Sequence, residues 1–168
     1  MPKRRALEAS EPLEIPEVTN DDGIDWVKKG AVNPIRDYGK CGADWAFGAA
    51  AAMESAHFIA TNELLSLSEQ QFIDCATDAK GCDGGVEVDA MFYAIQNPVA
   101  EEKDYPYTGK AGTCNDSQGG KVHTYRVKTL QSAYVPAMKG GIMGGPINLT
   151  VRADNIVFQA YTGGILDS

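Results

Sequence analysis

Apolar residues are most concentrated between residues 43 and 61. Within this stretch, the run from Ala49 to Ile59 has only three polar interruptions, Glu54, Ser55 and His57. A helix that is apolar on nearly all sides is buried at the centre of a domain. The pattern therefore predicts a central helix over 43–61, whose small alanine side chains let neighbouring elements approach closely.

The pattern further along the chain predicts two more helices and two strands. Ser68 followed by Gln71 is typical of a capping box at the start of a helix. A shorter helix is predicted over 88–96, just before an Asn-Pro pair. Alternation of apolar and polar positions predicts a strand over 122–130, and a second strand candidate covers 147–152.

The first 22 residues differ from the rest because they are rich in Glu, Pro and Asp and have no helical or strand periodicity. One interpretation is a disordered tail. The other is an extended arm that a different polypeptide holds in place, since a segment of this composition has little of its own to pack on. We expect the arm.

Charge and hydropathy exclude two classes of partner. The 168 residues carry a net charge of −8, whereas a surface that follows nucleic-acid phosphates needs an excess of Lys and Arg. No apolar run approaches the roughly 18 residues that suggest a membrane span. The basic N-terminus is followed by acidic residues, so no secretory signal is predicted and we expect an intracellular location.

The four cysteines at positions 41, 75, 82 and 114 leave several alternatives open. None of their spacings matches a zinc knuckle, so no metal site is predicted. Two disulfides are possible, in three pairings. Disulfides would imply an oxidising compartment, which the missing signal does not support. In a cytosolic chain the four cysteines would stay reduced and pack as small apolar residues.

Six separated blocks of the sequence carry a family likeness. They cover residues 25–35, 41–47, 67–75, 81–85, 104–107 and 158–165. In their order and spacing they resemble the papain family of cysteine peptidases. The resemblance implies an α+β, papain-like two-domain fold, in which the helical left domain is complete and the β-barrel-like right domain is incomplete.

The resemblance also implies domain boundaries and a cysteine pairing. Residues 1–22 would form the arm, 23–30 a crossover segment, 31–126 the helical left domain and 127–168 a partial antiparallel right domain. The implied disulfides are Cys41–Cys82 and Cys75–Cys114, which use all four cysteines and leave none to act as a nucleophile.

The sequence departs from the family at the positions that carry catalysis. The nucleophilic cysteine begins the central helix in the family, and here that position is Asp44. We expect the Asp44 carboxylate to cap the helix and complement its dipole. Tyr38 replaces the glutamine that donates to the oxyanion. The two histidines, His57 and His123, match no catalytic position of the family, whose catalytic His and Asn lie beyond residue 165.

Some positions could still bind a peptide. Gly84 and Gly85 match the family segment that pairs with substrate backbone, although the turn after Cys82 could be the only reason for them. By resemblance, Val86, Val88 and Thr150 lie near a side-chain pocket. Glycosylation is not expected at the Asn-x-Ser/Thr sequences that begin at Asn115 and Asn148, because no signal is seen and Asn148 matches an interior strand.

These observations lead to a functional hypothesis: an inactive papain-like pseudo-peptidase that serves as a structural or docking subunit of a larger assembly, cytoplasmic or cytoskeletal. Other protein subunits would cover the arm 1–22 and the incomplete sheet near 147–151, and no cofactor is expected. One alternative is a fragment or split chain of a cysteine endopeptidase, a proteolytic enzyme, whose missing His and Asn come from elsewhere. The location would be lysosomal or secretory only if the N-terminus is incomplete. Another alternative is a peptide-binding decoy.

Overall fold

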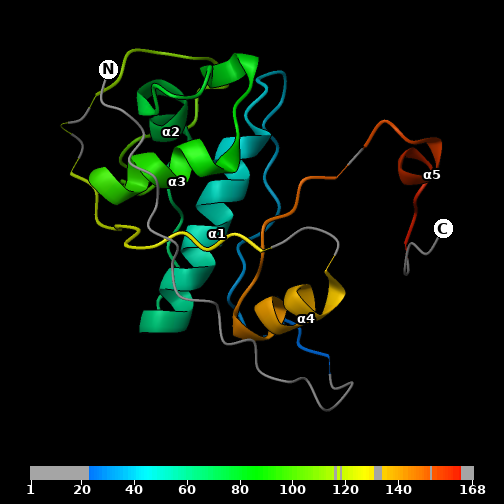
Figure 1. Ribbon diagram of the computed structural model, residues 1–168. Coiled ribbons are helices and arrows are strands. Elements are labelled where there is room, and N and C mark those ends of the chain that lie inside the picture. The colour runs from blue at the N-terminus through cyan, green and yellow to red at the C-terminus, as the bar shows by residue number, and fades with distance from the viewer. Residues whose placement is uncertain (1–22, 116, 118, 131–133, 152, 164–168) are drawn as a thin grey trace.

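The computed structural model describes residues 23–115, 117, 119–130, 134–151 and 153–163. The predicted arm 1–22 lies outside the described residues. Within these ranges the elements along the chain are five α-helices and one short 3-10 helix, with two isolated antiparallel bridges, Leu67 to Glu101 and Val99 to Val122 (Figure 1).

Helix α1, Asp44–Thr61, is the predicted central helix. Trp45, Ala46, Ala49 and Ala50 are buried, and helices α2 and α3 pack against this helix (Figure 1). Ala51, Ala56 and Ala60 are exposed, so the helix is central but not buried on all sides. The helix ends at Asn62, which adopts a left-handed conformation with φ 61° and donates its backbone N–H to the carbonyl of Phe58. A polar residue in this conformation is a common way to end a helix.

Helix α2, Glu69–Cys75, begins at the predicted cap, although only half of the capping box forms. The Ser68 hydroxyl accepts the backbone N–H of Gln71 at 3.0 Å. The Gln71 side chain does not reach back to Ser68. Its Oε1 accepts the backbone N–H of Ala100 at 2.7 Å, so it ties α2 to the segment that follows α3.

Helix α3, Glu87–Gln96, starts one residue before the predicted helix, after the short helix η1, Gly81–Asp83. The core lies between α1, α2 and α3. Its largest apolar members with less than 2% exposure are Trp45, Phe72, Leu67 and Val99. The helical core is therefore built by residues between 41 and 122.

The structure corrects both strand predictions. In 122–130 only the bridge at Val122 forms, and the Thr124 N–H donates to the carbonyl of Ala94 in α3. Residues 147–151 belong to no helix or strand, and residue 152 lies outside the described residues. Alternation gives a strand only where a second backbone accepts its hydrogen bonds, and no described segment beyond residue 122 does so.

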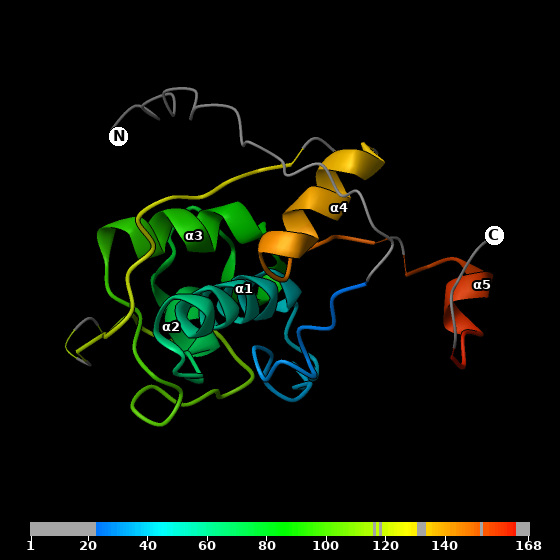
Figure 2. The ribbon, with the colours of Figure 1, turned by 90° about the horizontal axis from the view of Figure 1, so that it is seen from below.

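Two helices that the pattern did not predict lie in this later part of the chain. Helix α4, Val135–Gly144, contains three glycines and one proline. Because these residues have low helical propensity, the pattern did not predict this helix. Helix α5, Ile156–Gln159, has no buried residue and stands apart from α1–α3 in both views (Figures 1 and 2). The described part of 127–168 thus contains two helices and does not form the predicted antiparallel sheet, and the domain boundaries stay predictions.

Candidate functional site

Asp44 is the first residue of α1 and its side chain is exposed. The N-cap residue is Ala43, and no side chain caps this end, which corrects the expectation that Asp44 is the cap. A carboxylate in the first turn still interacts favourably with the helix dipole. The approach to the helix is fixed by the Cys41–Cys82 disulfide and by the Gly42 N–H, which donates to the carbonyl of Cys82 at 2.9 Å.

Tyr38 lies beside the first turn of the same helix. Its ring meets the ring of Phe47 edge-on, with centroids 6.0 Å apart, and Phe47 in turn meets Tyr107 at 5.0 Å. The Tyr107 hydroxyl donates to the backbone carbonyl of Tyr38 at 2.7 Å. The structure therefore brings Tyr38 and Asp44, the two positions of interest from the sequence, to one end of α1.

The structure explains in two different ways why the candidate cleft positions 84 and 85 are glycines. Gly84 has φ 110°, a backbone conformation that other residues rarely adopt, and a Cβ there would meet no atom within 4 Å. A Cβ on Gly85 would lie 2.7 Å from the indole ring of Trp45, so a side chain at Gly85 would displace the core. The backbone angle explains Gly84, and packing explains Gly85.

Val86 and Thr150 complete the set of candidate cleft residues. Val86 is exposed and caps the start of α3. The Thr150 hydroxyl donates to Oε1 of Glu87 at 3.0 Å, which ties Thr150 to the first residue of α3. Segment 147–151 also approaches α1, since a Cβ on Gly48 would lie 2.6 Å from the amide nitrogen of Asn148.

All four cysteines are in disulfides with the pairing that the resemblance implies. Cys41–Cys82 and Cys75–Cys114 have Cα atoms 4.6 and 4.8 Å apart. The expectation of reduced cysteines is therefore wrong for this structure. Because the sequence has four cysteines, no thiol remains to act as a nucleophile.

Neither histidine lies at the start of α1. His57 is thirteen residues further along the helix, about 20 Å at 1.5 Å per residue, and its Nε2 is 3.9 Å from a carboxylate oxygen of Glu63. His123 is exposed, with its ring 6.2 Å from that of Tyr125. Asp44 therefore has no imidazole beside it from either residue.

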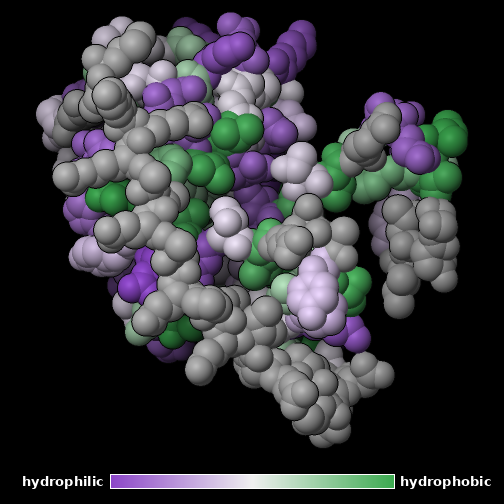
Figure 3. Space-filling model, viewed as in Figure 1, coloured by the Kyte–Doolittle hydropathy of each residue, from purple (hydrophilic) through white to green (hydrophobic). Residues whose placement is uncertain are grey.

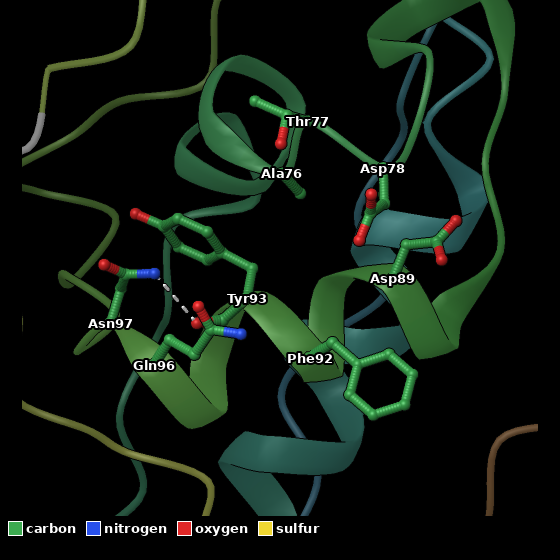
Figure 4. A pocket seen from close by; sticks show the side chains of 8 residues that line it. All are labelled: Ala76, Thr77, Asp78, Asp89, Phe92, Tyr93, Gln96 and Asn97. Atoms are coloured by element: carbon green, nitrogen blue, oxygen red, sulfur yellow. Dashed lines mark hydrogen bonds between the residues drawn. The ribbon is translucent and has the colours of Figure 1, made fainter. Parts of the chain in front are cut away.

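Two hollows of the surface lie elsewhere. One lies between the end of α2 and α3, and its lining includes Asp78 and Asp89 (Figure 4). The other is lined by residues of the loop after Tyr105 together with Gln70 and Asp74. Neither includes Asp44 or Gly84. The part of the chain that the structure describes holds no group of three metal-binding side chains and no helix long and apolar enough to span a membrane.

A buried charge network joins Arg36 to Glu54 and Glu69, and the sequence did not predict it. The Arg36 Nη2 donates to Glu54 Oε1 at 2.8 Å, and the same oxygen accepts the Leu67 N–H at 2.8 Å. The Arg36 Nη1 lies 2.8 Å from Glu69 Oε1 in an ion pair whose angles do not make a hydrogen bond. Glu54 and Glu69 are both 1% exposed. The sequence feature that could have indicated this network is Glu54, a charged residue inside an apolar helix.

Burial governs the ionisation of this network. Burial raises the pKa of the Glu69 carboxyl to about 7, although the Arg36 guanidinium acts in the opposite direction. The network holds the segment before α1 to both α1 and α2. It reaches α1 at Glu54, ten residues after Asp44, and α2 at its first residue, Glu69.

Comparisons with known proteins agree with this geometry. A family model described as "Papain family cysteine protease" matches residues 21–168. Zingipain-1 of Zingiber officinale is 40% identical over 148 residues, covering 86% of this chain and 66% of its own length. Mexicain of Jacaratia mexicana is 37% identical, with 87% and 69% covered.

A solved structure supports the fold. The Carica candamarcensis cysteine protease CMS1MS2, in complex with E-64, matches with a TM-score of 0.82 and 39% identity, covering 85% of this chain and 68% of that one. Against other relatives the chain spans less than half, such as 42% of cysteine proteinase 5 of Dictyostelium discoideum.

Proposed function

The chain belongs to the papain family of cysteine proteases, and from this premise we propose that it is a catalytically inactive member that serves as a structural or docking subunit. The observation that carries the proposal is the carboxylate of Asp44 at the first residue of α1. The family places its nucleophilic thiol at this helix end, where the dipole and a histidine keep it ionised.

The chemistry of the replacement argues against amide hydrolysis. A carboxylate is a far weaker nucleophile toward an amide than a thiolate. An aspartic-protease mechanism needs two carboxyl groups that share a proton, and among the described residues Asp44 is hydrogen-bonded to no second carboxyl. None of the four cysteines can supply the nucleophile in place of Asp44, because each is held in a disulfide.

A turnover assay tests the inactivity. Purified chain is incubated with a fluorogenic peptide substrate of broad specificity, alongside the matched variant Asp44→Ala. We expect the same background rate from both, because neither has a nucleophile. Turnover by the original chain that disappears in Asp44→Ala would show that the carboxylate works in catalysis and would contradict the proposal.

The docking role is supported by apolar side chains that solvent reaches. Leu149 is 56% exposed, Val151 57% and Ile156 74%, and Phe158 on α5 is also exposed. Apolar residues appear on the surface at α5 (Figure 3). Contiguous exposed apolar patches commonly mark protein interfaces. We propose that another protein subunit covers the segment from Leu149 to Phe158.

Site-specific crosslinking tests this partner. A photoreactive residue is placed at position 149 or 156, with position 125 as control, because Tyr125 is even more exposed but lies outside the segment. We expect positions 149 and 156 to crosslink to one and the same heterologous protein in cells, and position 125 not to. Crosslinks only to a second copy of this chain, or none, would contradict a heterologous partner.

The disulfides bear on the compartment. Stable disulfides are typical of oxidising compartments and rare in the cytosol. Within our proposal the assembly is therefore lysosomal or secretory, the second of the two locations that the sequence left open.

The alternative of a fragment of a cysteine endopeptidase is compatible with the partial coverage of the relatives. Asp44 argues against peptidase activity in that case too.

A peptide-binding role is the second candidate, favoured by the open space at Gly84 and the exposed Val86 beside it. An extended peptide could approach the backbone there. Saturable binding of an unfolded polypeptide that is lost in Val86→Asp and kept in Tyr125→Asp would support this role. Equal binding by both variants would contradict it.

A further inference from the structure

We propose that Asn115 is an N-glycosylation site, a modification that the sequence alone led us not to expect. Asn115 and Ser117 form an Asn-x-Ser acceptor sequence. Such sequences are acceptors only on a surface loop of a protein that passes through the secretory route. The structure supplies evidence on both conditions, and this inference does not depend on whether the chain is inactive.

The disulfides support passage through the secretory route. Asn115 directly follows Cys114, which is bonded to Cys75 across 39 residues of sequence. The second bond, Cys41–Cys82, closes a separation of 41 residues. Bonds of this kind form in the oxidising lumen where eukaryotic cells also attach N-linked sugars. The two disulfides therefore revise the expectation from the sequence that Asn115 is not glycosylated.

The surface position is supported by the exposure and conformation of the acceptor residues. Asn115 and Ser117 are both exposed. The Ser117 hydroxyl donates to Oδ1 of Asn115 at 2.6 Å, and the Ser117 N–H donates to the same oxygen at 3.3 Å. Both bonds use the amide oxygen of Asn115, and neither uses the amide nitrogen, which is the atom that accepts the sugar.

The surroundings of Asn115 have room for a sugar. Asn115 stands at the edge of a surface groove whose lining includes Tyr105 and Pro106. We therefore expect the first sugar ring to lie over this groove.

The second acceptor sequence, Asn148 to Thr150, has the opposite environment. Its amide nitrogen lies so close to α1 that a Cβ on Gly48 would be 2.6 Å away. The Thr150 hydroxyl donates to Glu87 and not to Asn148. A glycan on this nitrogen would separate segment 147–151 from α1, so we expect Asn115 alone to be occupied in the folded chain.

The reaction uses an oligosaccharide linked to a polyprenyl diphosphate as donor. The Asn115 amide nitrogen forms a bond to the anomeric carbon of the first sugar. The bond from that carbon to the diphosphate oxygen breaks, the diphosphate leaves with the electron pair, and the amide nitrogen gives up one proton to a base.

The test uses the full chain behind a secretory leader in a eukaryotic host. Intact mass is measured before and after a peptide amidase that removes N-glycans in ¹⁸O water, which marks each formerly glycosylated Asn as heavy Asp. Both the secreted and the cell-retained chains are analysed, because glycan transfer precedes export and an export defect would not hide the result.

We expect one glycan, with the heavy Asp at position 115. Asn115→Gln and Ser117→Ala should abolish it, whereas Ser117→Thr, which keeps a hydroxyl, and Asn148→Gln should retain it. An unmodified chain in both pools, or modification at Asn148 alone, would overturn the inference. Loss in Ser117→Thr as well as in Ser117→Ala would also overturn it, because the hydroxyl would then not be what matters.

Discussion

Helices α1–α3 and helix α5 differ in the environment of their apolar side chains. Phe72 in α2 is 0% exposed, whereas Phe158 in α5 is 41% exposed. Around Phe72 there are two other helices, two disulfides and a buried charge network, and α5 buries none of its residues. The comparison teaches that an apolar sequence becomes core only where other elements of the chain are in place to cover it.

The largest effect should come from making the same substitution in both regions. Phe72→Ala should lower the free energy of unfolding by roughly 3–5 kcal/mol, because it leaves a cavity in a packed core. Phe158→Ala should change it by less than about 0.5 kcal/mol, as at other exposed positions. Urea unfolding of the two variants measures both values. Similar losses would show that α5 is packed and would remove the contrast.

Breaking the charge network should have the next largest effect. Arg36→Met leaves Glu54 and Glu69 buried near each other without their shared cation, which should cost about 3 kcal/mol. The lower end of the usual range applies because the Arg36 side chain is 26% exposed. Urea unfolding of the variant gives the cost.

A second substitution serves as the control for Arg36→Met. The double variant Arg36→Met with Glu69→Gln should recover part of the loss, because one of the two uncompensated charges is gone. A loss below about 0.5 kcal/mol in the single variant, the size of an ordinary surface substitution, would mean that the network is not important for stability.

The pH dependence of stability should show a smaller effect. Burial holds the pKa of Glu69 at about 7 in the folded chain, against an ordinary value of 4.5. Between these values the folded chain binds more protons than the unfolded chain, so the contribution of Glu69 to stability falls as pH rises through this window and levels off above about pH 7.

Thermal unfolding between pH 4 and 8 measures this dependence, with Glu69→Gln as the matched variant. The variant should lack the decline that Glu69 contributes between about pH 4.5 and 7. Parallel curves for the two proteins would show that Glu69 titrates normally, in disagreement with its burial.

The same contrast explains what the sequence could predict. The helices α1–α3 follow from apolar runs and from the Ser68 cap, and the family motifs gave the cysteine pairing, because these signals are local or tied to a motif. The strands at 122–130 and 147–152 were wrong, since strand formation depends on a neighbouring backbone that alternation cannot reveal. Helix α4 was missed because Gly140 and Gly141 weaken the helical signal.

For the site, Asp44, Tyr38 and Gly84 were recognised from the motif positions. Their surroundings were not, because they depend on tertiary contacts. Trp45 beneath Gly85 and Glu87 beside Thr150 are examples, and so is Ala43 as the N-cap in place of Asp44.

The central claim, that a carboxylate stands where the family has its reactive thiol, can be tested with one labelling measurement. The chain and its Asp44→Cys variant are treated under non-reducing conditions with a thiol-alkylating reagent, and the intact masses are compared. We predict no adduct on the original chain, whose cysteines are all paired, and one adduct on the variant at residue 44. Rapid alkylation of the original chain at a single cysteine would reveal a free reactive thiol and contradict the account.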